Sequence, residues 1–443
     1  MLYILTIEII MLAILAYYLN NGHLLNPAFI VCVVFFLSCC FAIYGNKNWE
    51  YSIHSITVLI IFVSLMIFIV SAAFGTTLAN RIIVADKNFC ETDIPSVGIV
   101  MIISIILLYF DYQKWNTLQR IADEFGNMSV KGFGNVLLYS RHGMLSGDYS
   151  LTKADTYSYY ASRAVAYISL YLFMSNVILK KAAIKKIIYL LIPSIPYLIS
   201  AVLSTGRTEF IYFAVYIIVV FGVIYFQKYS MNFRAKWNVA KNALKWMVLF
   251  LILFSILQNL RENTPFEKML DMLAIYIGFP IPSLDYFLTD AKISSSIFGE
   301  HTLYGVYDVL RKFGFSIPSL YKPLERVYIN SYNGNIYTAL RRYIQDYSYL
   351  GNFIFMAFYG FCTSFFYNRV YLKKGHPVAL ILYAWFIYPV FEFSIEERVL
   401  SNQLGASTVY NLLAFFIFWI LLTRVNFKFF RFTSLKTVES KSK

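Results

Sequence analysis

The chain has 443 residues, of which 59% are hydrophobic and only 14% charged, and its formal net charge is +14. A soluble globular protein usually has about 45–50% apolar and about 25% charged residues, so this composition argues against a soluble fold. The positive charges lie in short segments between apolar runs. No long basic stripe interleaved with aromatic residues exists outside those segments, which argues against a nucleic-acid partner.

Eleven apolar runs are predicted to cross a membrane as helices, because each approaches the about 20 mostly apolar residues that a bilayer span requires. In chain order they are 2–19, 25–45, 53–75, 95–112, 159–179, 186–204, 208–227, 246–260, 349–370, 377–394 and 405–424, of which 246–260 is the shortest. We expect the first run to be a retained helix and not a signal peptide, since no Lys or Arg precedes Lys47.

The predicted fold is therefore an all-α integral membrane protein with about eleven transmembrane helices and one large periplasmic segment containing short amphipathic helices. Residues 1–260 would hold about eight spans, 261–348 the large segment, 349–424 about three spans, and 425–443 a basic cytoplasmic tail. The pieces 266–279 and 302–314 have spacing typical of short amphipathic helices that lie along the membrane surface.

The distribution of Lys and Arg predicts the orientation of the spans. If the spans alternate, the basic segments 180–186, 228–245, 369–376 and the tail after 424 share one side, which is then the cytoplasm. The turn at 204–207, the segment 261–348 with its nine basic and nine acidic residues, and the loop around 396–398 fall outside. Residues 113–158 have mixed charge and fit either side.

The residues that commonly bind metals show no ordered pattern. The five cysteines include no CxxC pair, and no clean DxD occurs in the segments predicted to lie outside. We therefore expect no metal, no cofactor and no disulfide framework.

Arg207 stands in a turn of very few residues between two predicted spans, directly after Gly206. Its guanidinium is expected to bind an anion, with phosphate the natural partner because the planar fork matches it bidentately. The alternative is an interfacial arginine that snorkels to the surface and pairs with Glu209.

A second group of candidates precedes the span at 349–370. On a helix, Arg342 and Asp346 are four residues apart and share one face, whereas Arg341 points elsewhere. Either Arg342 and Asp346 pair to fix the start of the helix, or the arginines bind a diphosphate and Asp346 acts as a base.

His301 is the only histidine of 261–348, and it is either a base or a structural residue. Arg261 and Arg326 are further cations of the same segment, and its many tyrosines fit either sugar stacking or an interfacial aromatic belt. Among the few charges within predicted spans, Glu8, Arg163 and Glu392 stand out, but the pattern assigns them no role.

The turn Gly206-Arg207-Thr208 resembles the Gly-Arg-Ser/Thr turn of oligosaccharide repeat-unit polymerases, the Wzy-type enzymes of O-antigen and capsule assembly. The stretch from Asn335 to Gly351 resembles the Asn-x-Tyr-Thr…Asp-Phe-Gly…Gly segment of that family, with Tyr347 and Ser348 in place of the usual Phe and Gly. Residues 298–302 resemble a weaker element of the family, and the order and spacing agree over roughly residues 200–370.

The resemblance implies a bacterial inner-membrane glycosyltransferase that acts on undecaprenyl-diphosphate-linked glycans, both as donor and as acceptor. It implies that Arg207, Arg341 and Arg342 stabilise the diphosphate leaving group, and that Asp346 or His301 removes the acceptor proton. Arg261, Arg326, Asn335, Tyr337 and Thr338 are expected to bind substrate, and a chain-length regulator and a flippase are the expected protein partners.

Two other functions fit the same pattern. An O-antigen ligase would share the substrate but transfer the glycan to a lipid A core. A lipid-linked oligosaccharide flippase would need alternating access and charges within its spans, whereas the charges here gather in one outer segment and no pseudo-symmetry relates the two halves.

Overall fold

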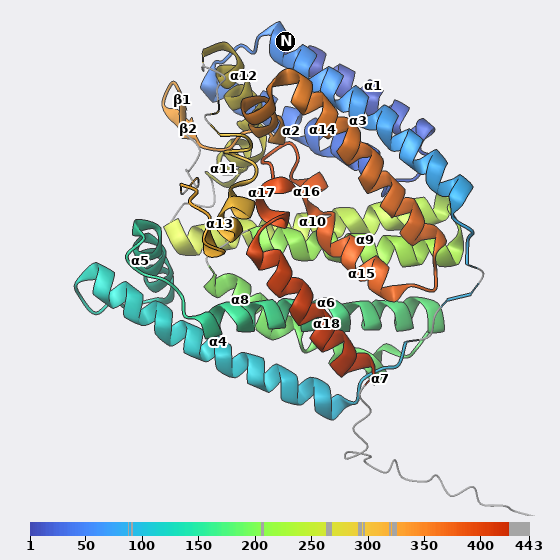
Figure 1. Cartoon of the computed structure of the whole chain (residues 1–443), viewed down its shortest axis with the longest axis vertical. Coiled ribbons are helices and arrows are strands. Elements are labelled where there is room, and N and C mark those ends of the chain that lie inside the picture. The colour runs from blue at the N-terminus through green and yellow to red at the C-terminus, as the bar shows by residue number, and fades with distance from the viewer. Residues whose placement is uncertain are drawn as a thin grey trace, which may run out of the picture.

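The computed structural model describes residues 1–86, 88–89, 92–204, 208–262, 268–290, 295, 297–318, 320 and 326–424, and their side chains except at 250, 254–255, 257–262 and 290. This part of the chain is almost entirely helical (Figure 1). The helices are α1 (Leu2–Leu19), α2 (Pro27–Trp49), α3 (Ser55–Ile82), α4 (Val97–Gly126), α5 (Phe133–Ser146), α6 (Lys153–Lys180), α7 (Ile184–Ile187), η1 (Ile188–Leu191), α8 (Ser194–Leu203), α9 (Thr208–Tyr229), α10 (Phe233–Glu262), α11 (Met269–Leu273), η3 (Ala274–Gly278), α12 (Pro280–Asp290), α13 (Tyr304–Lys312), α14 (Ala339–Leu372), α15 (Pro377–Phe386), α16 (Tyr388–Phe391), α17 (Leu400–Gln403) and α18 (Ala406–Thr423).

The prediction of an all-α, multi-pass membrane protein is confirmed. Among the described residues, nine helices are long and apolar enough to cross a membrane: α1, α2, α3, α4, α6, the run 184–203, α9, α14 and α18. Nine such helices, or ten with a bent pair, are consistent with the prediction of about eleven spans. The two remaining predicted runs fall in the shorter apolar stretch Pro377–Glu392 and in α10, where the side chains at 250, 254–255 and 257–262 lie outside the described residues.

One further pair of helices could form a tenth span. Met269–Gly278 and Pro280–Thr289 pass the same test together but meet at an angle of 43°, as in a broken span or a re-entrant loop. Pro280 has no backbone N–H to donate to the preceding helix, so it cannot continue that helix, and the bend lies at this residue. This pair lies inside the segment that was predicted to be wholly extramembrane.

Within the predicted helix 266–279, the described residues form the short helix α11 and its continuation η3, and residues 266–267 lie outside the described residues. The π-helical turn η3 packs against α2, where the Ser38 hydroxyl donates to the Ile277 carbonyl at 2.6 Å. At Gly278 a Cβ atom would lie 2.4 Å from the backbone nitrogen of Ala42, so only glycine allows this approach. The prediction of a short helix within 302–314 is confirmed by α13.

Helices α3 and α14 pack side by side through glycines. A Cβ atom at Gly75 would lie 2.4 Å from the Phe361 carbonyl oxygen, and one at Gly360 would lie 2.4 Å from that of Phe68. Small residues at a helix crossing allow backbones to approach closely, which is a common basis of helix association in membranes. In Figure 1 the two helices run side by side in the upper right part of the molecule.

The C-terminal ends of α6, α9 and α14 meet at one end of the bundle. Lys228 donates to the carbonyl of Ile178, and the Gln227 amide donates to the carbonyls of Val370 and Tyr371 at 2.9 and 3.1 Å. Lys373 adds an ion pair to Asp86 at 3.0 Å. Three of the four basic segments therefore lie at one end, as predicted, and we call it the basic end. The tail 425–443 lies outside the described residues.

Residues 113–158, whose side the sequence left open, belong to the opposite end. Helix α5 forms a small apolar cluster with the C-terminal half of α4, in which Val136 and Leu137 pack with Leu118 and with Leu203 at the end of α8. This segment therefore lies beside the C-terminal end of α8.

A small antiparallel hairpin, which the sequence did not predict, completes the same end. Strands β1 (Val327–Ile329) and β2 (Tyr332–Gly334) pair with Tyr328 opposite Asn333. The Asn330 amide in its turn donates to the Trp49 carbonyl at 2.6 Å, which ties the hairpin to the end of α2.

Candidate functional site

A cavity of about 440 Å³ opens between α6, α9, α13 and the segment from α15 to α18. Its lining combines aromatic rings with amides, hydroxyls and a few charges: Tyr159, Tyr160, Arg163, Glu209, Tyr212, Tyr304, Gly305, Asp308, Lys312, Trp385, Phe386, Tyr388, Ser401, Asn402, Gln403, Gly405, Ala406, Ser407, Thr408 and Asn411. Residues that are more than 200 positions apart in the sequence therefore share one wall. We call the end of the bundle that holds it the cavity end.

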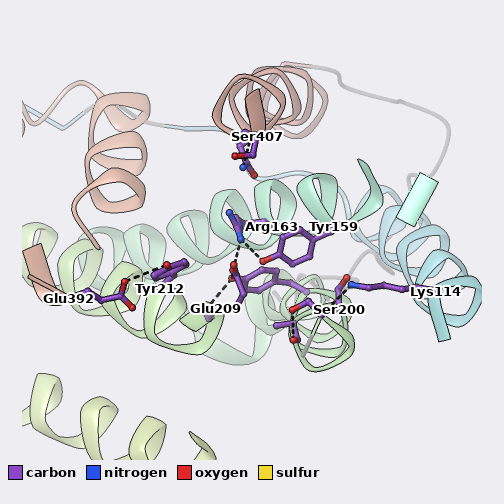
Figure 2. A network of polar contacts seen from close by, with 12 residues as sticks. Lys114, Tyr159, Arg163, Ser200, Glu209, Tyr212, Glu392 and Ser407 are labelled. Carbon is purple, nitrogen blue, oxygen red and sulfur yellow. Dashed lines mark hydrogen bonds and ion pairs between the residues drawn. The ribbon is translucent and has the colours of Figure 1, made fainter. Parts of the chain in front are cut away.

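Arg163 and Glu209 form an ion pair in the wall of this cavity (Figure 2). Both side chains are nearly buried, with 10% and 14% of their surface exposed. The same guanidinium donates to the Tyr159 hydroxyl, and the Tyr197 hydroxyl donates to Glu209 at 3.2 Å. Buried charges persist only when they are paired and hydrogen-bonded, and these four groups bond to one another, although the buried Nε of the Arg163 guanidinium has no hydrogen bond among the described residues.

Lys114 is a second buried cation next to this pair, and it contacts Tyr159. Its ammonium group donates to the Ser200 carbonyl at 3.1 Å and lies 5.3 Å from the centre of the Tyr159 ring. Lys114 is only 1% exposed, although it is a residue that proteins rarely bury. Figure 2 shows Lys114, Tyr159 and Arg163 reaching toward a common region from α4 and α6.

A chain of ionic contacts leads from the cavity to α14. The Tyr212 hydroxyl donates to Glu392 at 3.4 Å, and Arg398 lies 3.7 Å from Glu392. Arg398 also contacts Glu396 at 2.6 Å, and Glu396 pairs with Arg342 at 3.0 Å. The loop 396–398, which was predicted to lie on the same side as 204–207, thus connects the cavity to Arg342.

Arg342 does not pair with Asp346, contrary to the structural alternative proposed from their spacing. Its guanidinium binds Glu396 and donates to the His301 carbonyl at 2.8 Å. It also lies 5.8 Å from the centre of the Tyr304 ring, which lines the cavity. The partner was missed because Glu396 is 54 residues away in sequence, beyond the reach of a helix-face argument.

Asp346 instead holds the turn that contains His301. Its carboxylate accepts hydrogen bonds from the backbone N–H groups of His301 and Thr302 and from the Thr302 hydroxyl, at 2.8 to 3.1 Å. His301 and Asp346, predicted as candidate bases, are therefore neighbours. Burial lowers the pKa of His301, against an opposing effect of Asp346, so its imidazole is neutral at physiological pH.

Arg341 lies apart from Arg342, as its place on the helix predicted. It is 3% exposed, and its guanidinium stacks on Tyr337 with 3.7 Å to the ring centre and on Phe287 with 4.9 Å. Tyr337 and Thr338, predicted to bind substrate, are buried at the start of α14.

Ser348 breaks α14 in two. Its backbone has φ +62° and ψ −176°, a conformation that is essentially restricted to glycine. This is the position where the resembled motif has glycine. The short half, from 339 to 347, carries Arg341, Arg342 and Asp346, and the long half packs against α3.

The remaining candidates lie at the surface or outside the description. Arg326 is exposed and contacts the Asn333 side chain at 3.4 Å, and Asn335 is exposed after β2. Arg207 and the side chain of Arg261 lie outside the described residues. None of the described residues proposed for catalysis or substrate binding by number lines the cavity, but Tyr304, one of the tyrosines of 261–348 that fit sugar stacking, does.

Sequence reasoning therefore missed the cavity, although one signal pointed to it. Arg163 and Glu392 were recognised as charges within predicted spans, and such charges are usually functional. The amides and hydroxyls of 401–411 gave no signal, because a polar residue beside a span end is common. In the described part of the chain, no three His, Cys, Asp or Glu residues gather closely enough to hold a metal ion.

The fold and the site define a multi-pass α-helical membrane protein with a polar and aromatic cavity at one end of its helical bundle. No protein-family model, curated protein or solved structure matches the chain.

Proposed function

We propose that the chain is a membrane glycosyltransferase that polymerises undecaprenyl-diphosphate-linked oligosaccharide repeat units into O-antigen or capsular polysaccharide at the periplasmic face of the bacterial inner membrane. The observation that carries the proposal is the composition of the cavity wall. Aromatic faces such as Tyr160 and Trp385 suit the apolar faces of sugar rings, and the amides of Asn402, Gln403 and Asn411 suit their hydroxyl groups.

The position of the cavity also supports the proposal. It lies at the end of the bundle opposite the basic segments, and by the positive-inside rule that end faces the periplasm. Described residues beside or within the two segments that resemble the polymerase motifs belong to the cavity or to its contacts: Glu209, one residue after Thr208, lines it, and Arg342 is linked to it through Glu396, Arg398 and Glu392. The glycine-like backbone of Ser348 agrees with the same resemblance.

The proposed reaction breaks the bond between the donor sugar C1 and the diphosphate oxygen, and the leaving diphosphate keeps the electron pair. The acceptor hydroxyl oxygen forms the new bond to C1 and loses its proton to a base. We assign this role to Glu209, because it lines the cavity and is held by Arg163 and Tyr197. Arg163, Lys312 and Arg207 are the cations proposed to stabilise the diphosphate.

In this proposal Asp346 and Arg342 position the active site and do not touch substrate. Asp346 accepts three kinds of hydrogen bond from residues 301–302, and that turn leads directly into α13, which forms one wall of the cavity. Arg342 holds the His301 carbonyl of the same turn. Together they hold Tyr304 and Lys312 over the cavity.

The test is polymerisation of lipid-linked repeat units by the purified chain in proteoliposomes. We expect Glu209→Gln to lower kcat by about 100-fold or more while the protein still binds the lipid-linked unit. The control is Asp86→Asn, which changes a carboxylate at the basic end and should leave kcat unchanged.

Three results would overturn the proposal: no polymer from the wild type, transfer only to a lipid A core, or full activity of Glu209→Gln. Glu209→Asp keeps a carboxylate at this position. If its elution profile and melting temperature match those of the wild type, the protein is folded, and a change in activity then reports on the base and not on misfolding.

A further inference from the structure

An apolar groove of about 410 Å³ lies between the C-terminal half of α1 and the N-terminal half of α2. Eight residues form it: Ile10, Ala13, Ile14, Tyr17, Tyr18, Phe29, Val33 and Phe36. Ile14 and Tyr18 are 53% and 74% exposed, so the described part of the chain leaves this face uncovered. In a membrane such a face is occupied by lipid, and a groove can hold one chain more firmly than a flat helix face.

A cation lies at one end of this groove. The Lys236 ammonium group donates a hydrogen bond to the Tyr17 hydroxyl at 2.9 Å and lies 4.9 Å from the centre of the Tyr17 ring. It also approaches Gly22 so closely that a Cβ atom there would lie 2.7 Å from Nζ. Tyr17 therefore belongs both to the apolar wall and to the site of the positive charge.

The nearby histidine does not contribute a charge. Burial, with a smaller contribution from Lys236, lowers the pKa of His23 to about 4, and its ring contacts the Tyr367 hydroxyl at 3.1 Å. His23 is thus neutral at physiological pH, and Lys236 provides the positive potential at this end of the groove.

The groove opens at the basic end, opposite the cavity. His23 follows α1 and contacts Tyr367 in the last turns of α14, which end beside the ends of α6 and α9. The positive-inside rule assigns this end to the cytoplasm, where the leaflet surface is rich in anionic lipid. A lipid in this groove is therefore not one that reacts in the cavity.

We propose that the groove binds one acyl chain of an anionic phospholipid of the cytoplasmic leaflet, with the lipid phosphate on Lys236. Lysine binds phosphate as a point charge, and the apolar wall runs from Tyr17 toward Ile10, along the direction that a lipid chain takes into the membrane. The inference is independent of the proposed enzymatic function, since neither depends on the other site.

The test measures the melting temperature of the full chain in detergent with added phosphatidylglycerol, or with phosphatidylcholine carrying the same acyl chains. We expect phosphatidylglycerol to raise the Tm of the wild type by about 3 °C or more, and phosphatidylcholine to raise it much less. Lys236→Gln should abolish the difference between the two lipids, and Ala13→Phe, which fills the groove, should abolish the response to both.

The matched control is Lys241→Gln, which removes an exposed lysine of the same helix and should keep the wild-type preference. The proposal is wrong if both lipids stabilise the wild type equally, if Lys236→Gln behaves like Lys241→Gln, or if Ala13→Phe still responds. The first result would indicate ordinary solvation by any lipid, and the last would indicate binding elsewhere on the chain.

Discussion

Two helix pairs cross the molecule and are held together in different ways. Between α3 and α14 the contacts are backbone against backbone, and the buried polar groups are neutral: Asn368 donates to Thr76 at 3.1 Å. Thr76 also donates to Asn20 at 2.8 Å and accepts from Asn26 at 3.3 Å, which ties the connection between α1 and α2 to the same group. Between α6 and α9 the Tyr167 and Tyr216 rings stack with centroids 4.0 Å apart, and the polar contact is the charged pair of Arg163 and Glu209 beside a cavity.

The difference separates polar groups that serve stability from polar groups that serve function. Neutral amides and hydroxyls that satisfy one another, with no space beside them, fix how two helices meet. A buried ion pair is a poor way to gain stability, because removing two charges from water costs about as much as their attraction returns. A charged pair that is retained next to an open cavity therefore indicates a role in binding or chemistry.

The largest expected effect comes from breaking the charged pair. Glu209→Leu leaves the Arg163 guanidinium buried without its carboxylate, and we expect a loss of about 3–5 kcal/mol in the free energy of unfolding. The double variant Arg163→Met with Glu209→Leu should recover most of that stability and remain inactive. Denaturant unfolding in detergent and the polymerisation assay measure the two quantities. If the double variant is active, Arg163 and Glu209 have only a structural role and are not needed for the reaction.

The next effect comes from the α3–α14 contact. Gly360→Leu would force a side chain into the Phe68 carbonyl, and we expect a loss of about 3 kcal/mol in stability from overpacking. Thermal unfolding of the purified protein measures it. Phe358→Leu, on an exposed position of the same helix, is the control and should change stability little. Equal stability of the two variants would refute the close approach of the helices.

A smaller effect in the opposite direction is expected where α14 bends. Ser348→Gly places a residue without a Cβ atom in a conformation that glycine adopts without strain. We expect stability to rise by about 1 kcal/mol, which is the relieved strain less the greater freedom of the unfolded chain. Ser348→Ala should instead keep the strain and gain nothing. If Ser348→Gly lowers the melting temperature, the two halves of α14 are not arranged as described.

The smallest expected effect is a pH dependence at the turn beside the cavity. Because burial lowers the folded-state pKa of His301 below its ordinary value of 6.5, the unfolded chain takes up its proton first as the pH falls. The contribution of His301 to stability is therefore complete above about pH 6.5 and is lost as the pH falls through the lower folded pKa. His301→Gln should flatten the change in melting temperature between pH 7 and pH 5. An unchanged slope would contradict the neutral, buried imidazole.

Much of the fold followed from the sequence because a membrane span needs a long apolar run, and such runs are visible one at a time. The side shared by the basic segments 180–186, 228–245 and 369–376 followed from the same local counting. The bend at 269–289 did not, because Asp285 breaks the apolar pattern. Its carboxylate is buried only because His54, Thr57 and Tyr51 bind it, and those partners lie more than 200 residues away.

The candidate site followed from the sequence less completely, for the same reason. Spacing on one helix correctly separated Arg341 from Arg342, but it could not reveal that Arg342 pairs with Glu396. The sequence named His301 and Asp346 as candidate bases of the same site, but it did not predict the hydrogen bonds between Asp346 and the backbone of residues 301–302. The ionic partner of Glu209 is Arg163, 46 residues earlier, and a chain scan that assigns partners to nearby residues favours Arg207 instead.

The anchoring of Asp285 to the start of α3 has a consequence for chimeric proteins built from this chain. Residues 269–289 belong to the helical bundle through Asp285 and Gly278, so exchanging the whole of 261–348 for a foreign loop would remove part of the bundle with it. A graft with junctions after Asp290 and before Thr338 would leave those anchors intact. Such a graft would exchange only α13, the hairpin and their connections, which is the portion that borders the cavity from outside the bundle.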